Sequence, residues 1–350
     1  MTRVVITSGS GGVGKTTTAA AIGLAFAARG QRVAVLTIDP GRRLADALGI
    51  ASVDNAPQRV PTPVGQLDAM MLDAKLTFDD LVARHAPSPE VRDRILANHY
   101  YRFVSERLPG VHEYMAMERL LSLCNDGAYD TIVLDTPPAR HALDFLTAPD
   151  RMAGLMDEGV MRWLVLPASA GGWRMIEMGS EVLAGVLKRM LGERTIEEIA
   201  EFFSGFQSLW AGFRERSLAT RALLRAPTTS FVLVTTPAPG ARAEALAFLA
   251  VLRRADLPFA GFVINRCAEA PPAVVRWPAP PSPDYVALFL ALDLGLSRRR
   301  QLVAAQASTV RDLLAHAPAG ALAWRLPDSD TQVASLAGLA ALGARVDLGP

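Results

Sequence analysis

The chain has 350 residues, half of them hydrophobic, so it is long enough to bury a large core. Its 36 basic and 35 acidic residues nearly cancel. That balance argues against a general nucleic-acid-binding protein, because such proteins carry a basic excess or a basic stripe.

The first forty residues predict a strand, a glycine-rich loop, a helix and a second strand. Residues 4–7 form a short apolar run that is typical of a buried strand. Residues 15–29 are rich in alanine and predict a helix that ends at Gly30. Residues 33–38 predict the second buried strand, and Asp39 follows it directly.

The middle of the chain predicts a helical subdomain. Residues 67–72 favour a strand, residues 76–126 are mostly helical, and residues 131–134 form a clear strand that ends in Asp135. The next convincing strand begins only at residue 231, although a crossover between parallel strands needs little more than one helix. We therefore expect a single domain over 1–350, into which segments of about 76–126 and 150–226 insert helices.

Alternation of strands and helices resumes after this insertion. Strands are predicted at 231–234, at 259–264 before Asn265, and at 321–326, with helices at 195–216 and 242–254, two more within 284–316, and one at the C-terminus. Residues 270–283 are rich in proline and indicate a loop. This order predicts an α/β fold, with a mainly parallel sheet and helices on both of its faces.

The cysteines and the hydropathy of the chain indicate where in the cell the protein is expected. Cys124 and Cys267 lie far apart and form no Cys-x-x-Cys pair, so we expect two buried thiols and neither a zinc site nor a metalloid site. No signal-peptide core opens the chain, and no uncharged apolar stretch has the length of a membrane span. A cytoplasmic protein is expected, with any membrane contact peripheral or through a partner.

The loop between the first strand and the first helix carries the strongest motif. It reads Gly9-Ser10-Gly11-Gly12-Val13-Gly14-Lys15-Thr16 and matches G-x-x-x-x-G-K-[ST] between a strand and a helix. The glycines let backbone N–H groups turn toward phosphate oxygens, and the helix N-terminus adds a partial positive charge. Lys15 can reach the β- and γ-phosphates, and the Thr16 hydroxyl can bind Mg²⁺. ATP and Mg²⁺ are the predicted cofactors.

Two carboxylates stand where strands end. Asp135 occupies the expected position of the acidic residue that holds the Mg²⁺ shell. Asp39 can orient or activate the attacking water, or it can serve as the N-cap of a helix that begins at Leu44. The candidates for the metal shell are Thr16, Asp39 and Asp135.

Several segments together resemble the arsenite-pump and tail-anchored-protein-targeting (ArsA-like) ATPase family of deviant-Walker P-loop proteins. They are residues 8–18, Thr37-Ile38-Asp39-Pro40 with Leu44-Ala45-Asp46, 67–75, Pro109-Gly110-Val111-His112-Glu113, 135–143, 234–237 and 263–266. The resemblance covers roughly residues 2–345. It implies that the loop through Thr17 binds phosphate and Mg²⁺, that Asp39 activates water, that Asp135 opens a second switch and that Asn265 contacts adenine. It also implies a face-to-face dimer around two ATP molecules.

The chain departs from the family at three places. Ser10 replaces a signature lysine that reaches the partner's nucleotide, and serine cannot supply that charge. Arg140 stands where a glycine is usual, and the family's cysteine pairs and clusters are absent. Asp39 and Asp135, which lie in the family's two nucleotide-responsive switch segments, are called here the switch carboxylates. Arg42 or Arg140, which flank them in the sequence, could substitute for the lysine.

Two functions therefore remain open. The first is an ATP-hydrolysing switch, a homodimer or a heterodimer with a paralogous ATPase, that serves an apolar protein or membrane partner at the helical subdomain. The second is a nucleotide-binding regulatory subunit with weak or no turnover. Six methionines of the subdomain, from Met152 to Met190, either line a cargo surface or fill a core.

Overall fold

A sheet built around β1 (Arg3–Gly9) forms the centre of the protein in a computed structural model, which describes residues 2–39, 41–99, 101, 102, 105, 111–137, 210–273, 285–328 and 335–349. Its strand order is β3-β4-β2-β5-β1-β6-β7-β8. The other strands are β2 (Arg32–Thr37), β3 (Gln58–Val60), β4 (Gln66–Met71), β5 (Thr131–Asp135), β6 (Thr229–Thr235), β7 (Phe259–Cys267) and β8 (Leu322–Pro327). All pairings between neighbours are parallel except that of β3 with β4. The predicted α/β fold with a mainly parallel sheet is confirmed.

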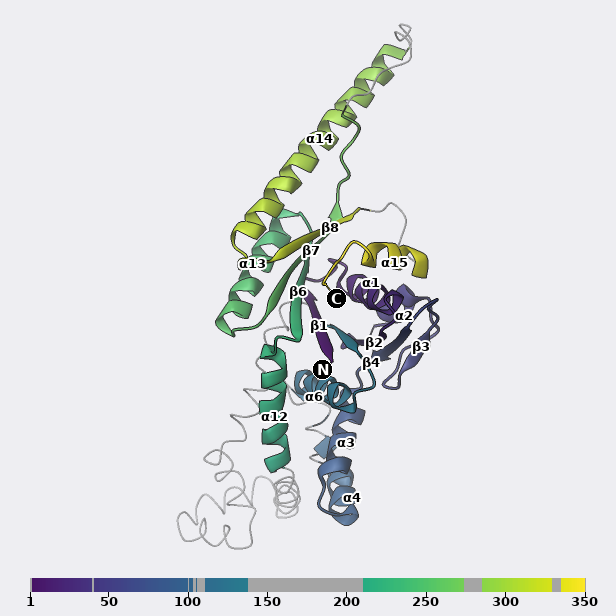
Figure 1. Cartoon of the computed structure of the whole chain (residues 1–350), viewed down its shortest axis with the longest axis vertical. Helices are drawn as coiled ribbons and strands as arrows, with labels where there is room; N and C mark the ends of the chain where they lie inside the picture. Colours follow the sequence, from purple (N-terminus) through teal and green to yellow (C-terminus); the bar gives the residue numbers. More distant parts are fainter. Residues whose placement is uncertain are drawn as a thin grey trace, which may run out of the picture.

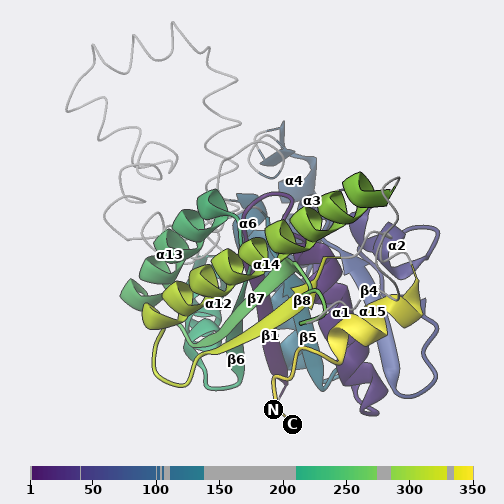
Figure 2. The same ribbon diagram turned by 90° about the horizontal axis from the view of Figure 1, so that it is seen from above.

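Helices cover both faces of this sheet, as Figures 1 and 2 show. One face packs against α1 (Lys15–Ala28), α2 (Arg43–Leu48) and α15 (Leu336–Gly343). The other packs against α6 (Val111–Asp126), α12 (Trp210–Arg225), α13 (Pro239–Arg254) and the last turns of α14 (Val286–Ala315). Alternate residues of each strand point to opposite faces, so Val5 contributes to the first layer while Val4 and Ile6 contribute to the second.

A separate aromatic core holds a block of helices below the sheet. It joins α3 (Ala74–His85) and α4 (Pro89–Ala97) to α6 and α12, and Figure 1 shows α3, α4 and α12 extending away from the strands. The Phe78 ring lies 5.3 Å from that of Tyr101 and 5.7 Å from that of Phe213. Glu118 of α6 accepts a hydrogen bond of 2.7 Å from Arg216 Nε of α12. The described residues within 76–126 are therefore mostly helical, as predicted, whereas 138–209 lie outside the part of the chain that the structure describes.

Two predictions about individual elements were wrong or incomplete. Residues 286–315 form one helix, α14, where two were expected, because its internal Gly295 lowers helix stability by about 1 kcal/mol without ending the helix. The short edge strand β3 was not predicted. The helix predicted over 195–216 is described only from Trp210, as α12. None of the described helices combines the length and apolarity that crossing a membrane requires.

The register of the central strands determines which residues meet at the carboxyl edge of the sheet. Asp135 of β5 lies opposite Thr7 of β1 on one side and Thr37 of β2 on the other. The loop that follows β1 and the turn that follows β2 therefore begin at the same edge, on either side of this carboxylate.

Candidate functional site

Three glycines of the loop, Gly9, Gly12 and Gly14, are required by the backbone conformation or by crowding. Gly12 and Gly14 have φ values of 77° and 94°, in the left-handed region that favours glycine. A Cβ atom on Gly9 would lie 2.0 Å from the carbonyl oxygen of Val234, and one on Gly14 would lie 2.3 Å from Asn265 Nδ2. The chain can thus enter α1 only through a glycine loop. Gly14 is the N-cap of α1, whose first turn has no side-chain cap and no acidic residue, which leaves its N–H groups available to an anion.

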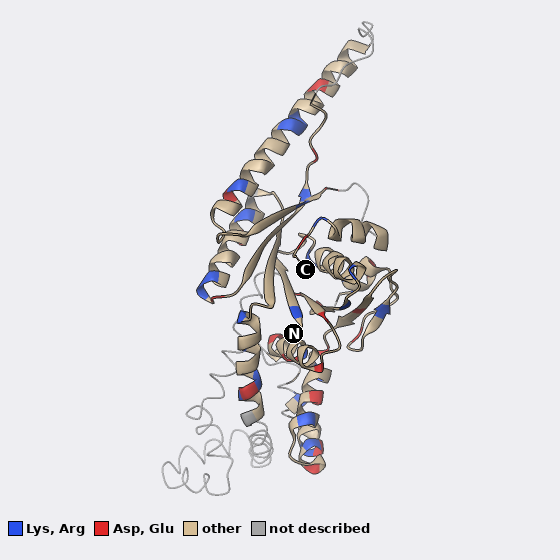
Figure 3. Cartoon of the chain, viewed as in Figure 1, with Lys and Arg blue, Asp and Glu red and all other residues tan. Residues whose placement is uncertain are grey.

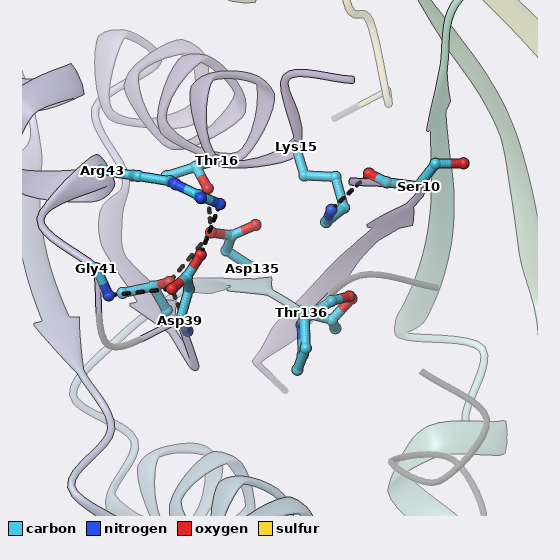
Figure 4. A network of polar contacts seen from close by, with 10 residues as sticks. Ser10, Lys15, Thr16, Asp39, Gly41, Arg43, Asp135 and Thr136 are labelled. Atoms are coloured by element: carbon cyan, nitrogen blue, oxygen red, sulfur yellow. Dashed lines mark hydrogen bonds and ion pairs between the residues drawn. The ribbon is translucent and has the colours of Figure 1, made fainter. Parts of the chain in front are cut away.

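Lys15 lies folded over this loop. Its Nζ atom donates a hydrogen bond of 2.8 Å to the backbone carbonyl of Ser10, and the residue is only 9% exposed. Burial lowers the pKa of the amine, while the charge of Asp135 acts in the opposite direction. The ammonium group of Lys15 therefore lies against the backbone of the loop (Figure 4).

Asp135 is the buried carboxylate of the site. Its Oδ2 atom accepts hydrogen bonds from the hydroxyls of Thr16 at 2.7 Å and Thr37 at 3.1 Å. Its Oδ1 atom is buried and has no hydrogen-bond partner within the described part of the chain. Burial raises the pKa of Asp135 to about 6, against the two hydroxyls and the charge of Lys15. Because an unpaired buried acceptor is costly, this oxygen is suited to bind a cation.

Asp39 is held in a short turn after β2. Its Oδ1 atom accepts from the backbone N–H of Gly41 at 3.0 Å, and its Oδ2 atom accepts from Arg43 Nη1 at 2.9 Å. The N-cap position of α2 is Arg42, with no side-chain cap. The alternative that Asp39 caps this helix is therefore wrong; the carboxylate faces the site instead (Figure 4).

Among the described residues, the arginine at the site is not Arg42, the one of the two indicated by the sequence that the structure describes. Arg42 Nη2 donates to the carbonyl of Ala51 at 2.7 Å and not to either carboxylate, and Arg140 lies outside the described residues. Arg43 is the arginine that contacts a switch carboxylate. Its place four residues after Asp39, the spacing of a helical ion pair, was the signal that could have identified it.

Asn265 connects the end of β7 to the loop. Its Nδ2 atom donates to the carbonyl of Val13 at 2.9 Å, and its Oδ1 atom accepts from the N–H of Arg266. The amide thus lies against Gly14, at the start of α1. A residue that is distant in sequence is brought to the phosphate loop.

Hydroxyls that the sequence did not indicate link the strands behind the site. Thr136 Oγ1 donates to the carbonyl of Thr7 at 2.8 Å and shares a hydrogen bond of 3.2 Å with Ser8 Oγ. The Thr37 hydroxyl also accepts from the N–H of Asp39 at 3.2 Å, so one side chain contacts both carboxylate segments. The sequence feature that could have identified these hydroxyls is their position at strand ends, close in sequence to Asp135, Asp39 or the phosphate loop.

These features fit a nucleotide with Mg²⁺. Gly9 and Gly14 leave no room for a side chain, and a helix N-terminus and Lys15 offer positive charge. Asp135 offers Oδ1, a buried oxygen without a hydrogen-bond partner among the described residues, on the carboxylate whose Oδ2 accepts from the Thr16 hydroxyl. A phosphate chain and a hard divalent cation require this combination of donors and oxygen ligands.

Comparison with known proteins gives a consistent result. A family model described as anion-transporting ATPase matches residues 2–271. A putative arsenical pump-driving ATPase of Halobacterium salinarum is 31% identical, over 49% of this chain and 27% of its own length. ATPase get3 of Aspergillus terreus is 31% identical, over 42% of this chain and 43% of its own. ATPase ASNA1 homolog 1 of Paramecium tetraurelia is 27% identical, over 46% of this chain and 47% of its own length. The matched region is thus less than half the length of each of these relatives.

Proposed function

The chain belongs to the anion-transporting ATPase family, and from this membership and the geometry of its loop we propose that it is a Mg²⁺-dependent ATPase that acts as a nucleotide-driven switch. The observation that carries the proposal is the meeting of Lys15, Thr16 and Asp135 at one edge of the sheet, where Asp135 Oδ1 is buried and has no hydrogen-bond partner among the residues that the structure describes. The nucleotide state of a dimer would be coupled to an apolar cargo or a membrane-associated partner.

Each part of the site has a proposed role in binding ATP and Mg²⁺. Thr16 and Asp135, together with Asp39, would hold the Mg²⁺ shell, and Asn265 would contact adenine from the end of β7, beside the loop. The phosphates are cradled by the backbone N–H groups and side chains of Gly9, Ser10, Gly11, Gly12, Val13, Gly14, Lys15, Thr16 and Thr17. When bound, Mg²⁺ supplies charge that stabilises the phosphoryl group during transfer.

Asp39 is proposed to act on the attacking water. The carboxylate accepts a proton from this water while the water oxygen bonds to the γ-phosphorus and ADP departs with the electron pair of the broken bond. Since Asp39 Oδ2 is bonded to Arg43, the carboxylate acts only after this arginine turns away.

Arg43 is proposed to supply the charge that Ser10 does not. Its side chain is 70% exposed, and it lies close enough to Lys15 for its charge to lower the pKa of that amine. An exposed ion pair is worth less than about 1 kcal/mol, so the phosphates of ATP can compete with Asp39 for the guanidinium. A cation beside the transferring phosphoryl group stabilises the transition state.

The second candidate is a regulatory subunit, which Ser10 favours. In this arrangement a paralogous ATPase with an intact lysine completes the site of this chain in a heterodimer, and the chain alone turns over slowly. The helical subdomain, of which α3, α4, α6 and α12 are described, is the proposed place of cargo within the single P-loop domain.

Phosphate release by the purified chain, with and without Mg²⁺ and with and without a paralogous ATPase, separates these functions. The switch predicts Mg²⁺-dependent turnover by the chain itself. Turnover that arises only with the paralogue supports the regulatory subunit, and an absence of both turnover and ATP binding contradicts the proposal.

A further inference from the structure

The N-terminal part of α14 leaves the body of the protein. Figure 1 shows this helix projecting beyond β7 and β8, and only Val310 and Leu313, near its other end, are buried. We call residues 285–296 the tip; their sequence is Tyr-Val-Ala-Leu-Phe-Leu-Ala-Leu-Asp-Leu-Gly-Leu. Leu288, Leu290 and Leu294 of the tip are 54%, 65% and 52% exposed. Such a concentration of exposed leucines marks an interaction surface.

The exposed apolar side chains of the tip surround the helix instead of forming one stripe. At 100° per residue, Val286, Leu290 and Leu294 share one side, whereas Leu288 and Leu292 lie on nearly the opposite side. Asp293 is the one charged residue of the tip sequence. A contact with another protein would bury one stripe, but a helix that is apolar all round suits a hydrocarbon environment.

Positive charge begins where the tip ends. Arg298, Arg299 and Arg300 form a band just beyond the tip, and Figure 3 shows blue (Lys, Arg) on the α14 ribbon below the one red (Asp, Glu) stretch near its projecting end. Arg299 Nε donates to the carbonyl of Glu269, and Arg300 Nη2 donates to those of Pro272 and Ala273. These carbonyls fix the arginines beside the helix but carry no formal charge, so the band stays positive.

We propose that the tip inserts into the surface of a membrane that contains anionic lipids, with the arginine band at the level of the headgroups. A helix of twelve residues is about 18 Å long, less than the roughly 30 Å of a hydrocarbon core, so the tip enters one leaflet and does not cross. Apolar burial and headgroup attraction act together, as in interfacial helices. This surface is separate from the nucleotide site.

Co-sedimentation of the full chain with vesicles tests the proposal. Wild type is expected to bind vesicles of phosphatidylcholine and phosphatidylserine in equal parts more tightly than vesicles of phosphatidylcholine alone. The double variant Leu288→Glu/Leu290→Glu should lose about tenfold or more in the bound fraction, because it places two charges in the inserted segment. Arg298→Glu should weaken binding to the anionic vesicles and reduce its dependence on salt.

Leu302→Glu is the matched control. Leu302 lies on the same helix beyond the arginine band and is 45% exposed, so its charge stays outside the inserted segment and this change should weaken binding far less than the double variant. All these positions are exposed, and thermal unfolding by circular dichroism confirms that the variants fold. Equal binding by wild type and the double variant, or no binding by wild type, overturns the proposal. If wild type does not bind vesicles and the double variant has a different oligomeric mass by light scattering, the tip would instead be a contact with a second copy of the chain.

Discussion

The guanidinium Nη1 of Arg43 lies 2.9 Å from the Oδ2 atom of Asp39, one helical turn along the chain. The pair joins the first residue of α2 to the carboxylate that follows β2 (Figure 4). One contact therefore occupies both the proposed base and the proposed source of positive charge. If ATP draws the arginine toward its phosphates, the same movement frees the carboxylate.

Replacement of Arg43 by alanine should lower kcat for ATP hydrolysis by about tenfold or more, with a smaller change in KM, because charge is lost from the transition state. Arg42→Ala is the matched control, since Arg42 bonds to the carbonyl of Ala51 away from the carboxylates. A rise in kcat for Arg43→Ala would mean that the arginine only blocks Asp39.

The Asp39→Asn variant should bind ATP nearly as tightly as wild type but hydrolyse it about 100-fold more slowly, because an amide cannot take the proton of the attacking water. Single-turnover phosphate release, together with calorimetric binding of ATP, separates the two effects. Hydrolysis at the wild-type rate would leave Asp39 with a purely structural part in the turn.

The phosphate loop and the strand-end carboxylates could be predicted from sequence because each belongs to a short segment with its own pattern. Lys15, Thr16 and Asp135 were indicated in this way, and the structure brings them together. Arg43 was not indicated, because the choice between it and Arg42 depends on the direction in which each side chain points at the start of α2, and the sequence does not give that direction.

Some of the architecture was hidden for a similar reason. The strand β3 has three residues, flanked by prolines, and its partner in β4 is known only from the fold. The contact of Asn265 with Val13 spans most of the chain, and the sequence alone could not supply its geometry. In each case the decisive interaction is non-local, whereas periodicity reports local structure.

Introduction of a lysine by Ser10→Lys should raise the ATPase activity of the isolated chain by about tenfold, if a missing charge at the dimer limits turnover. The backbone carbonyl of Ser10 holds Lys15, so the substitution leaves that contact possible. Ser10→Ala is the control and should have little effect. Fast turnover by wild type that Ser10→Lys leaves equal or impairs would show that the chain needs no added charge.

The stability of the nucleotide-free protein should depend on Asp135. Its pKa is raised to about 6 in the folded protein from 3.8, so the folded state retains a proton that the unfolded state releases between these values. This stabilisation is complete below pH 3.8 and is lost as the pH rises toward 6, a change on the order of 3 kcal/mol.

The variant Asp135→Asn has no charge to bury, so it should become more stable than wild type as the pH rises through this window, as measured by urea unfolding at several pH values without Mg²⁺ or nucleotide. The amide oxygen can still accept from Thr16 and Thr37. The variant should also lose the extra stabilisation that Mg²⁺ gives with ATP. A stability difference that is constant with pH would contradict this assignment.

Calorimetric titration of Mg²⁺-ATP into wild type and into Lys15→Ala tests the central claim, that the loop of residues 9–16 is the nucleotide site. We predict that wild type binds ATP and that Lys15→Ala loses at least about tenfold in affinity, because the cation that lies over the loop is removed. An unchanged affinity in the variant, with its fold intact by circular dichroism, would contradict the account.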